Sequence, residues 1–190
     1  MTVQVEHAIA QLIANPAGVQ QVIQRDVPMF ASDWGAKDED ALVHTLGINL
    51  LGNLGRAAGY VGVIEYPVPR ARRWQKKLVR VDAAWFDRKT RYPVVLAEFE
   101  RFSMEKILEK QTNLYVAAHG CENPPAVLLL CVWALDGISI DTSWYDPVRP
   151  LPVPGGATVA RPKNTHMLLV QAVLGCHGER LYFLKLRRLA

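Results

Sequence analysis

The chain has 190 residues, half of them hydrophobic, and a formal net charge of +4 at neutral pH. This length suits a single domain, residues 1–190, and no apolar stretch approaches the length of a membrane span, so we exclude a membrane partner and expect a soluble, cytoplasmic protein. The excess of basic residues favours a polyanionic partner.

Helices are predicted for the N-terminal part, residues 1–35, and for the segment that follows it. Apolar residues recur at helical spacing over residues 4–25, and Pro16 interrupts them, which predicts two short helices. Residues 38–60 predict a long amphipathic helix. Glu39 lies at the start of this helix, where the helix dipole favours acids, so we expect it to cap the helix.

The first strand of a sheet is predicted for residues 61–67, and a strongly basic run follows at residues 70–80. Glu65 on this strand is either a fourth carboxylate beside the three acids described next or a rim acid that pairs with nearby arginines. Lysine and arginine neutralise phosphates, so we expect the basic run to bind DNA or RNA, the alternative being a solvated loop. The residues expected to contact nucleic acid here are Arg70, Arg72, Arg73, Lys76 and Lys77.

Three acidic residues interrupt the next two apolar runs, residues 78–86 and 94–100, which a polar turn separates. The runs predict a β-hairpin that carries Asp82 on one strand and Glu98 and Glu100 on the other. Because residues i and i+2 of a strand point to the same face, Glu98 and Glu100 project together, and we expect the three carboxylates to converge. Such a cluster often holds a divalent cation, and oxygen ligands suit Mg²⁺ or Mn²⁺.

A helix over residues 104–118 and an uninterrupted apolar strand over residues 126–133 are predicted next. A strand without alternation suits a central position that is covered on both faces. The helix between the two strands predicts a β-α-β crossover, and therefore parallel strands. Lys106 and Lys110 share one face of this helix, because they lie four residues apart.

The C-terminal part, residues 136–190, predicts a long loop and a closing hairpin. Residues 136–164 are rich in Pro, Gly and Asp and form the best candidate for a mobile or partner-contacting element. Residues 166–173 and 180–186 predict the hairpin. The whole pattern predicts an α/β fold with a mixed central β-sheet flanked by helices, and a core at about residues 38–135.

The order of these features resembles the catalytic core of the PD-(D/E)xK nuclease superfamily, which has the restriction-endonuclease-like fold. In that family an acid on one strand is followed, on the next strand, by an acid, one spacer residue and usually a lysine, and then by a helix that packs across the sheet. Asp82 and Glu98 match the two acids, within a likeness that spans roughly residues 39–133, and are implied to bind Mg²⁺ or Mn²⁺. Glu100 stands at the position of the lysine.

The departure at Glu100 leaves the role of the family's lysine open. Glu100 itself can act as a base or metal ligand, or Lys106 or Lys110 on the following helix replaces the lysine. The resemblance also implies that an acid on the helix before the sheet, here Glu39, can join the metal site. Gln111 resembles the polar residues that the family carries on the later helix, so we expect it to contact nucleic acid.

Three functional hypotheses follow from these features. The first is a metal-dependent nuclease that hydrolyses phosphodiester bonds in DNA, as a homodimer or inside a larger complex, because no DNA-reading module is visible. The second is a catalytically inactive nuclease-fold module that binds nucleic acid or assembles a larger defence or repair complex. The third is an unrelated α/β protein in which Arg80 and Arg101 pair with the acids in a structural ion-pair network. Metal-dependent cleavage separates the first hypothesis from the other two.

Overall fold

The computed structural model describes residues 2–68, 79–153 and 155–190, in which helices accompany a seven-stranded mixed β-sheet. The helices are α1 (Thr2–Ala14), α2 (Pro16–Asp26), the short 3-10 helix η1 (Pro28–Phe30), α3 (Asp40–Ala57) and α4 (Met104–Gly120). The strands of the sheet are β1 (Ala36–Lys37), β2 (Val61–Val68), β3 (Val79–Phe86), β4 (Pro93–Arg101), β5 (Val127–Leu135), β8 (His166–His177) and β9 (Arg180–Arg188). These strands lie side by side in the order β1-β9-β8-β5-β4-β3-β2.

The three central strands, β4, β5 and β8, run parallel, and the outer pairs are antiparallel. The predicted hairpins are both confirmed, as β3–β4 and β8–β9. The predicted crossover is also confirmed, because α4 connects β4 to its parallel neighbour β5. Every residue of β5 except the last is buried, as expected for a central strand that is covered on both faces.

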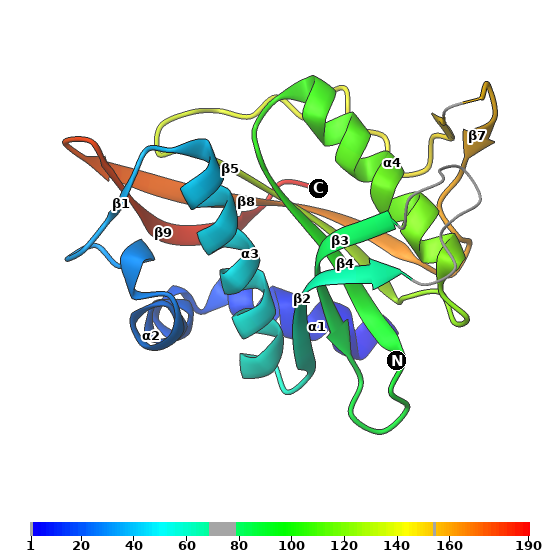
Figure 1. Ribbon diagram of the computed structural model, residues 1–190, viewed down its shortest axis with the longest axis horizontal. Coiled ribbons are helices and arrows are strands. Elements are labelled where there is room, and N and C mark those ends of the chain that lie inside the picture. The colour runs from blue at the N-terminus through cyan, green and yellow to red at the C-terminus, as the bar shows by residue number, and fades with distance from the viewer. Residues whose placement is uncertain (1, 69–78, 154) are drawn as a thin grey trace.

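Helices cover both faces of the sheet (Figure 1). On one face, α1, α2 and α3 bury alternate residues of the strands, such as Trp85 and Phe99, in one hydrophobic cluster. On the other face, α4 and the segment after β5 bury the intervening residues, such as Leu96 and Leu130, in a second cluster. The alternation of strand residues between the two clusters follows the two-residue period of β-structure.

The segment between β5 and β8, predicted as a long loop, packs against the second cluster. It contains two short strands, β6 (Leu151–Pro152) and β7 (Thr158–Val159), which pair with each other. Its apolar residues Ile140, Leu151 and Val159 are buried in the second cluster. Tyr115 of α4 also donates a hydrogen bond to the carbonyl of Pro147, at 2.8 Å. The Pro- and Gly-rich pattern concealed these contacts, because apolar residues without a regular period give no signal of what they pack against.

The short edge strand β1 was not predicted, because two residues are too few to show a pattern. It pairs with β9 through Ala36 and Leu181. In the part of the chain that the structure describes, no helix combines the length and the hydrophobicity that crossing a bilayer requires.

Candidate active site

The predicted acids lie where β3 and β4 diverge, a point that we call the fork. The ladder between these strands ends at the pair Ala83–Ala97, beyond which β3 stays paired with β2 and β4 stays paired with β5. Asp82, the next residue of β3, places its side chain in the gap. Its Oδ2 accepts a hydrogen bond from the backbone N–H of Phe99 at 2.8 Å, so a carboxylate replaces the strand as the partner of β4.

Two side chains of α4 join the strands across the fork. Lys110 Nζ donates to Glu98 Oε2 at 2.7 Å and to Asp82 Oδ2 at 3.4 Å. Asn113 Nδ2 donates to Glu98 Oε1 and, at 2.8 Å, to the backbone carbonyl of Arg80. Lys110 and Asn113 lie three residues apart, so they occupy one face of the helix. We call Asp82, Glu98, Lys110 and Asn113 the fork site.

The acids of the fork site are buried, and burial changes the pKa values of its ionisable groups. Glu98 is 0% exposed and Asp82 is 8% exposed. Burial, together with the negative charge of Asp82, raises the pKa of Glu98 well above its ordinary value. Burial by itself lowers the pKa of Lys110, but the carboxylates of Glu98 and Asp82 outweigh burial and raise it. Lys110 therefore stays protonated, and its ammonium contacts both buried acids.

Glu100 lies beside the fork site, but its contacts are different. Its Oε1 accepts hydrogen bonds from the backbone N–H of Arg101 at 2.9 Å and from Lys106 Nζ at 3.3 Å. Among residues 2–68, 79–153 and 155–190, no group of three or more acidic, His or Cys side chains is arranged to hold a metal ion. Of the three carboxylates expected to converge, the structure thus brings together those of Asp82 and Glu98, and Glu100 makes separate contacts.

Two other acids proposed as metal ligands, Glu65 and Glu39, do not form a metal-holding group with this pair among the described residues. Glu65 is exposed and pairs with Arg80 at 3.3 Å, which confirms the rim-acid alternative. Glu39 is the N-cap residue of α3 by position, but its side chain makes no capping hydrogen bond. Arg101 pairs with Asp40 at 2.8 Å. The two arginines of the structural-network hypothesis therefore bind rim acids, and Lys110 is the partner of the buried acids.

The side chain of Gln111 does not reach the surface where contact with nucleic acid was expected. It is 1% exposed, and its Nε2 donates to Tyr115 Oη at 2.8 Å and to the carbonyl of Asp146 at 3.1 Å. Gln111 thus holds the segment after β5 against α4, and its expected role is corrected. The predicted nucleic-acid contacts Arg70, Arg72, Arg73, Lys76 and Lys77 lie outside the described residues.

His44 is a candidate site residue that sequence reasoning did not select. Its Nε2 lies 3.7 Å from Asp82 Oδ1, and its Nδ1 is buried without a hydrogen-bond partner in the described structure. Helix α3 comes this close because Gly47, one turn later, packs directly on the ring of Phe99, where a Cβ atom would lie 2.0 Å from a ring carbon. A glycine inside a predicted helix was the available signal, but it did not reveal which strand the helix contacts.

Asp82 and Glu98 are the residues of the fork site that could hold a magnesium ion. Mg²⁺ prefers hard oxygen ligands and is commonly held by one or two carboxylates while it keeps several waters. Asp82 and Glu98 supply two carboxylates that contact one common cation, the ammonium of Lys110. A divalent ion at this place would favour the ionised form of Glu98, which burial disfavours.

Comparisons with protein-family models, with curated proteins and with solved structures find no match for the chain. The case for a function therefore depends on the geometry and chemistry of the fork site.

Proposed function

We propose that the chain is a metal-dependent nuclease with a restriction-endonuclease-like core, which hydrolyses phosphodiester bonds in DNA. The observation that carries this proposal is the position of Lys110, which contacts both Asp82 and Glu98 where β3 and β4 diverge. Two acids from neighbouring strands and a lysine from the following helix supply the same chemical groups as the PD-(D/E)xK set. We assign to Lys110 the role of the family's motif lysine, whose position in the sequence is occupied by Glu100.

Lys110 suits this role better than the other two candidates. Lys106 is half exposed and binds Glu100, so its charge is directed away from the buried acids. Glu100 is engaged by the same lysine and by a backbone N–H. Lys110 is only 21% exposed and lies between the two carboxylates, where a positive charge acts in a medium of low dielectric constant.

Each residue of the fork site has a defined part in the proposed reaction. Asp82 and Glu98 would hold Mg²⁺, whose positive charge would polarise the phosphoryl group. The ammonium of Lys110 donates a hydrogen bond from Nζ to a phosphate oxygen and stabilises the negative charge that develops there. Asn113 fixes the orientation of Glu98, and the N–H of Phe99 fixes that of Asp82.

The direct test is DNA cleavage by the purified protein and by an Asp82→Asn variant. Plasmid, linear and single-stranded DNA are incubated with Mg²⁺ or Mn²⁺, or with EDTA. We expect metal-dependent cleavage that leaves a 5′-phosphate, and a loss of at least about 100-fold in the variant, as is typical when one electrostatic group of an active site is removed. Asp33→Asn, at an exposed acid outside the fork site, is the matched control and should cut normally.

Both variants must unfold at the same urea concentration as the parent protein for the comparison to hold. DNA binding without metal-dependent cleavage would contradict the proposal and favour the non-cutting module. Cleavage that survives Asp82→Asn would place the active site elsewhere in the chain.

A further inference from the structure

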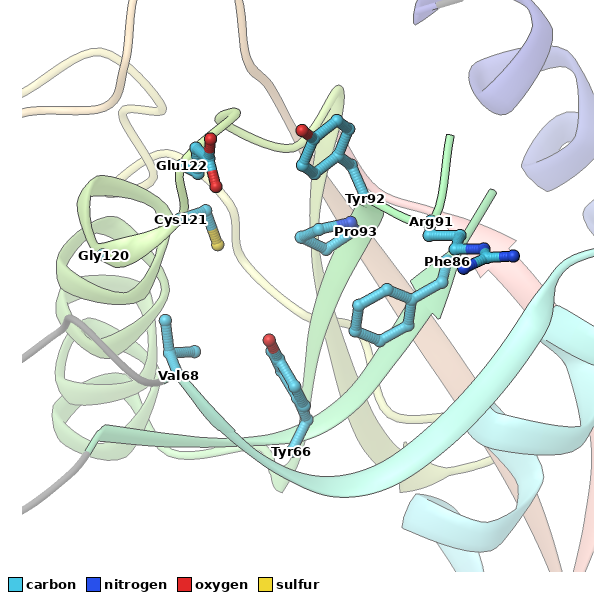
Figure 2. A pocket seen from close by; sticks show the side chains of 9 residues that line it. All are labelled: Tyr66, Val68, Phe86, Arg91, Tyr92, Pro93, Gly120, Cys121 and Glu122. Carbon is cyan, nitrogen blue, oxygen red and sulfur yellow. The ribbon is translucent and has the colours of Figure 1, made fainter. Parts of the chain in front are cut away.

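A second feature of the molecule is a cavity of about 270 Å³ at the C-terminal end of α4. Figure 2 shows the side chains that surround it, which come from β2, the end of β3, the β3–β4 turn with the start of β4, and the residues that end α4. Three aromatic rings, those of Tyr66, Phe86 and Tyr92, form much of its lining. Cys121 and Glu122 lie on the opposite side, next to the helix.

The curvature of the β2–β3 ribbon creates this cavity. Tyr66 is paired with Val81, and Phe86 is paired with Val61, so the two rings belong to distant parts of the same ladder. Their centroids are nevertheless only 5.1 Å apart, with the rings edge to face. The ribbon must therefore bend strongly between them. The bend turns the aromatic face of the ribbon toward the end of α4.

The backbone is constrained on two sides of the cavity. Within the described residues, the non-glycine residues with positive φ are Glu65, at 52°, and Arg91, at 62°. Glu65 directly precedes Tyr66, and Arg91 lines the cavity beside Tyr92. This conformation is unfavourable for residues with a side chain, and such residues cluster at ligand sites. Both of them adjoin the same aromatic cavity.

The chemistry of the lining suits a planar heterocycle with polar edges. Aromatic rings bind nucleobases by stacking on their faces. The Tyr66 hydroxyl points into the cavity, and the Glu122 carboxylate is an acceptor for the amino group of a base. Cys121 offers a neutral, apolar surface, because burial raises the pKa of its thiol to about 11.

The surrounding charge favours a nucleotide over a cationic ligand. An aromatic cavity with one carboxylate also suits a quaternary ammonium group. Here, however, the exposed residue Arg91 is part of the lining. Positive charge repels an ammonium ligand and attracts the phosphate of a nucleotide.

We infer that this cavity binds a nucleobase, either of a nucleic-acid strand held at the fork site or of a free nucleotide. The inference rests on the proposed action on nucleic acid. Gly120, at the cavity, follows Asn113, at the fork site, by seven residues of α4, which corresponds to about 10 Å along the helix. A strand bound at the fork site can therefore place a nearby unpaired base in the cavity, which makes single-stranded or locally opened nucleic acid the favoured substrate.

The test compares Tyr92→Ala with the parent protein in binding assays without metal. Tyr92 is 40% exposed, so its removal leaves the core intact. The probes are a single-stranded deoxyoligonucleotide, an abasic oligonucleotide of the same length, and free AMP, GMP, CMP and TMP. We expect Tyr92→Ala to bind the base-containing oligonucleotide about 10-fold more weakly, the usual consequence of one lost stacking contact, and Tyr92→Phe to bind normally. Trp34→Ala, at another exposed aromatic residue, is the matched control and should also bind normally.

Each outcome of this experiment decides the inference. A loss confined to the oligonucleotide with bases identifies a strand as the ligand, whereas a parallel loss for the monophosphates identifies a free nucleotide. Equal affinities of Tyr92→Ala and the parent protein for every probe, or displacement of the probes by choline, would overturn the inference. DNA cleavage with Mg²⁺ is measured separately. If the parent protein cleaves DNA and Tyr92→Ala binds every probe as the parent does, the base-binding inference fails and the nuclease proposal stands. If Tyr92→Ala loses base binding and the parent protein does not cleave DNA, the nuclease proposal fails and the base-binding inference stands.

Discussion

The geometry of the fork depends on single residues, and Asp82 is the most important of them. Its carboxylate binds the backbone of β4 and the ammonium of Lys110 with the same oxygen atom, while the other oxygen faces His44. Helices from both faces of the sheet thus reach one side chain. A carboxylate in this position stabilises the divergence of two strands and at the same time keeps an oxygen atom for a cation.

Which lysine contacts the buried acids could not be predicted from the sequence. Lys106 and Lys110 lie on one face of α4, one turn apart, and both are near the acids in the chain. Only the position of α4 along β4 decides which of them reaches Glu98, and that position depends on tertiary packing. The acids themselves were predictable, because charged residues inside apolar strands are rare unless they are paired or functional.

At the residue scale, Glu98→Gln tests how far the ionisation of the buried Glu98 side chain lowers the free energy of unfolding. The folded-state pKa of Glu98 lies above its ordinary value of 4.5, so the folded protein binds this proton more tightly than the unfolded chain. Ionisation of Glu98 therefore lowers the free energy of unfolding as the pH rises from about 4.5 to the folded-state pKa. Glutamine cannot ionise, so the stability of Glu98→Gln relative to the parent should increase with pH across this window.

The measurement is urea unfolding in EDTA at pH 4.5, 6 and 8, with Glu109→Gln, at an exposed acid of α4, as the control. A stability difference between Glu98→Gln and the parent protein that falls as the pH rises would mean that the buried carboxylate is stabilised in its ionised form. The same variant should lose metal-dependent cleavage, which separates a functional charge from a structural one.

At the scale of elements, the contact between α3 and β4 positions the fork. Gly47 lies against the ring of Phe99, the residue between Glu98 and Glu100, so any side chain at position 47 must displace α3 or β4. The helix, the hairpin and the crossover were each predictable from the period of their apolar residues. Their mutual placement was not, because a glycine leaves no hydrophobic signal of the surface on which it packs.

Gly47→Ala should therefore destabilise the protein and disturb the site. The new methyl group meets Phe99 at 2.0 Å, and overpacking of this kind typically costs about 1–3 kcal/mol, which exceeds the gain in helix propensity. Urea unfolding measures the change, with Thr45→Ala, at an exposed position of the same helix, as the control. Unchanged stability in Gly47→Ala would show that α3 moves away freely, and the close contact would then not position the fork.

At the scale of the whole molecule, the sheet separates two hydrophobic clusters, and β3 and β4 diverge at the fork. The first cluster lies under α1, α2 and α3, and the second lies under α4 and the segment after β5. The α/β class and the mixed sheet followed from strand patterns. The packing of the segment after β5 did not, because its buried residues, such as Leu151 and Val159, stand among prolines and glycines without a period.

One measurement tests the central claim that Asp82, Glu98 and Lys110 form the catalytic centre of a nuclease. It is the rate of Mg²⁺-dependent DNA cleavage by Lys110→Met compared with Lys106→Met, two variants that remove one charge each from the same face of α4. We predict a loss of at least about 100-fold for Lys110→Met and cleavage near the parent rate for Lys106→Met. Equal rates for the two folded variants, or a loss only in Lys106→Met, would contradict the claim.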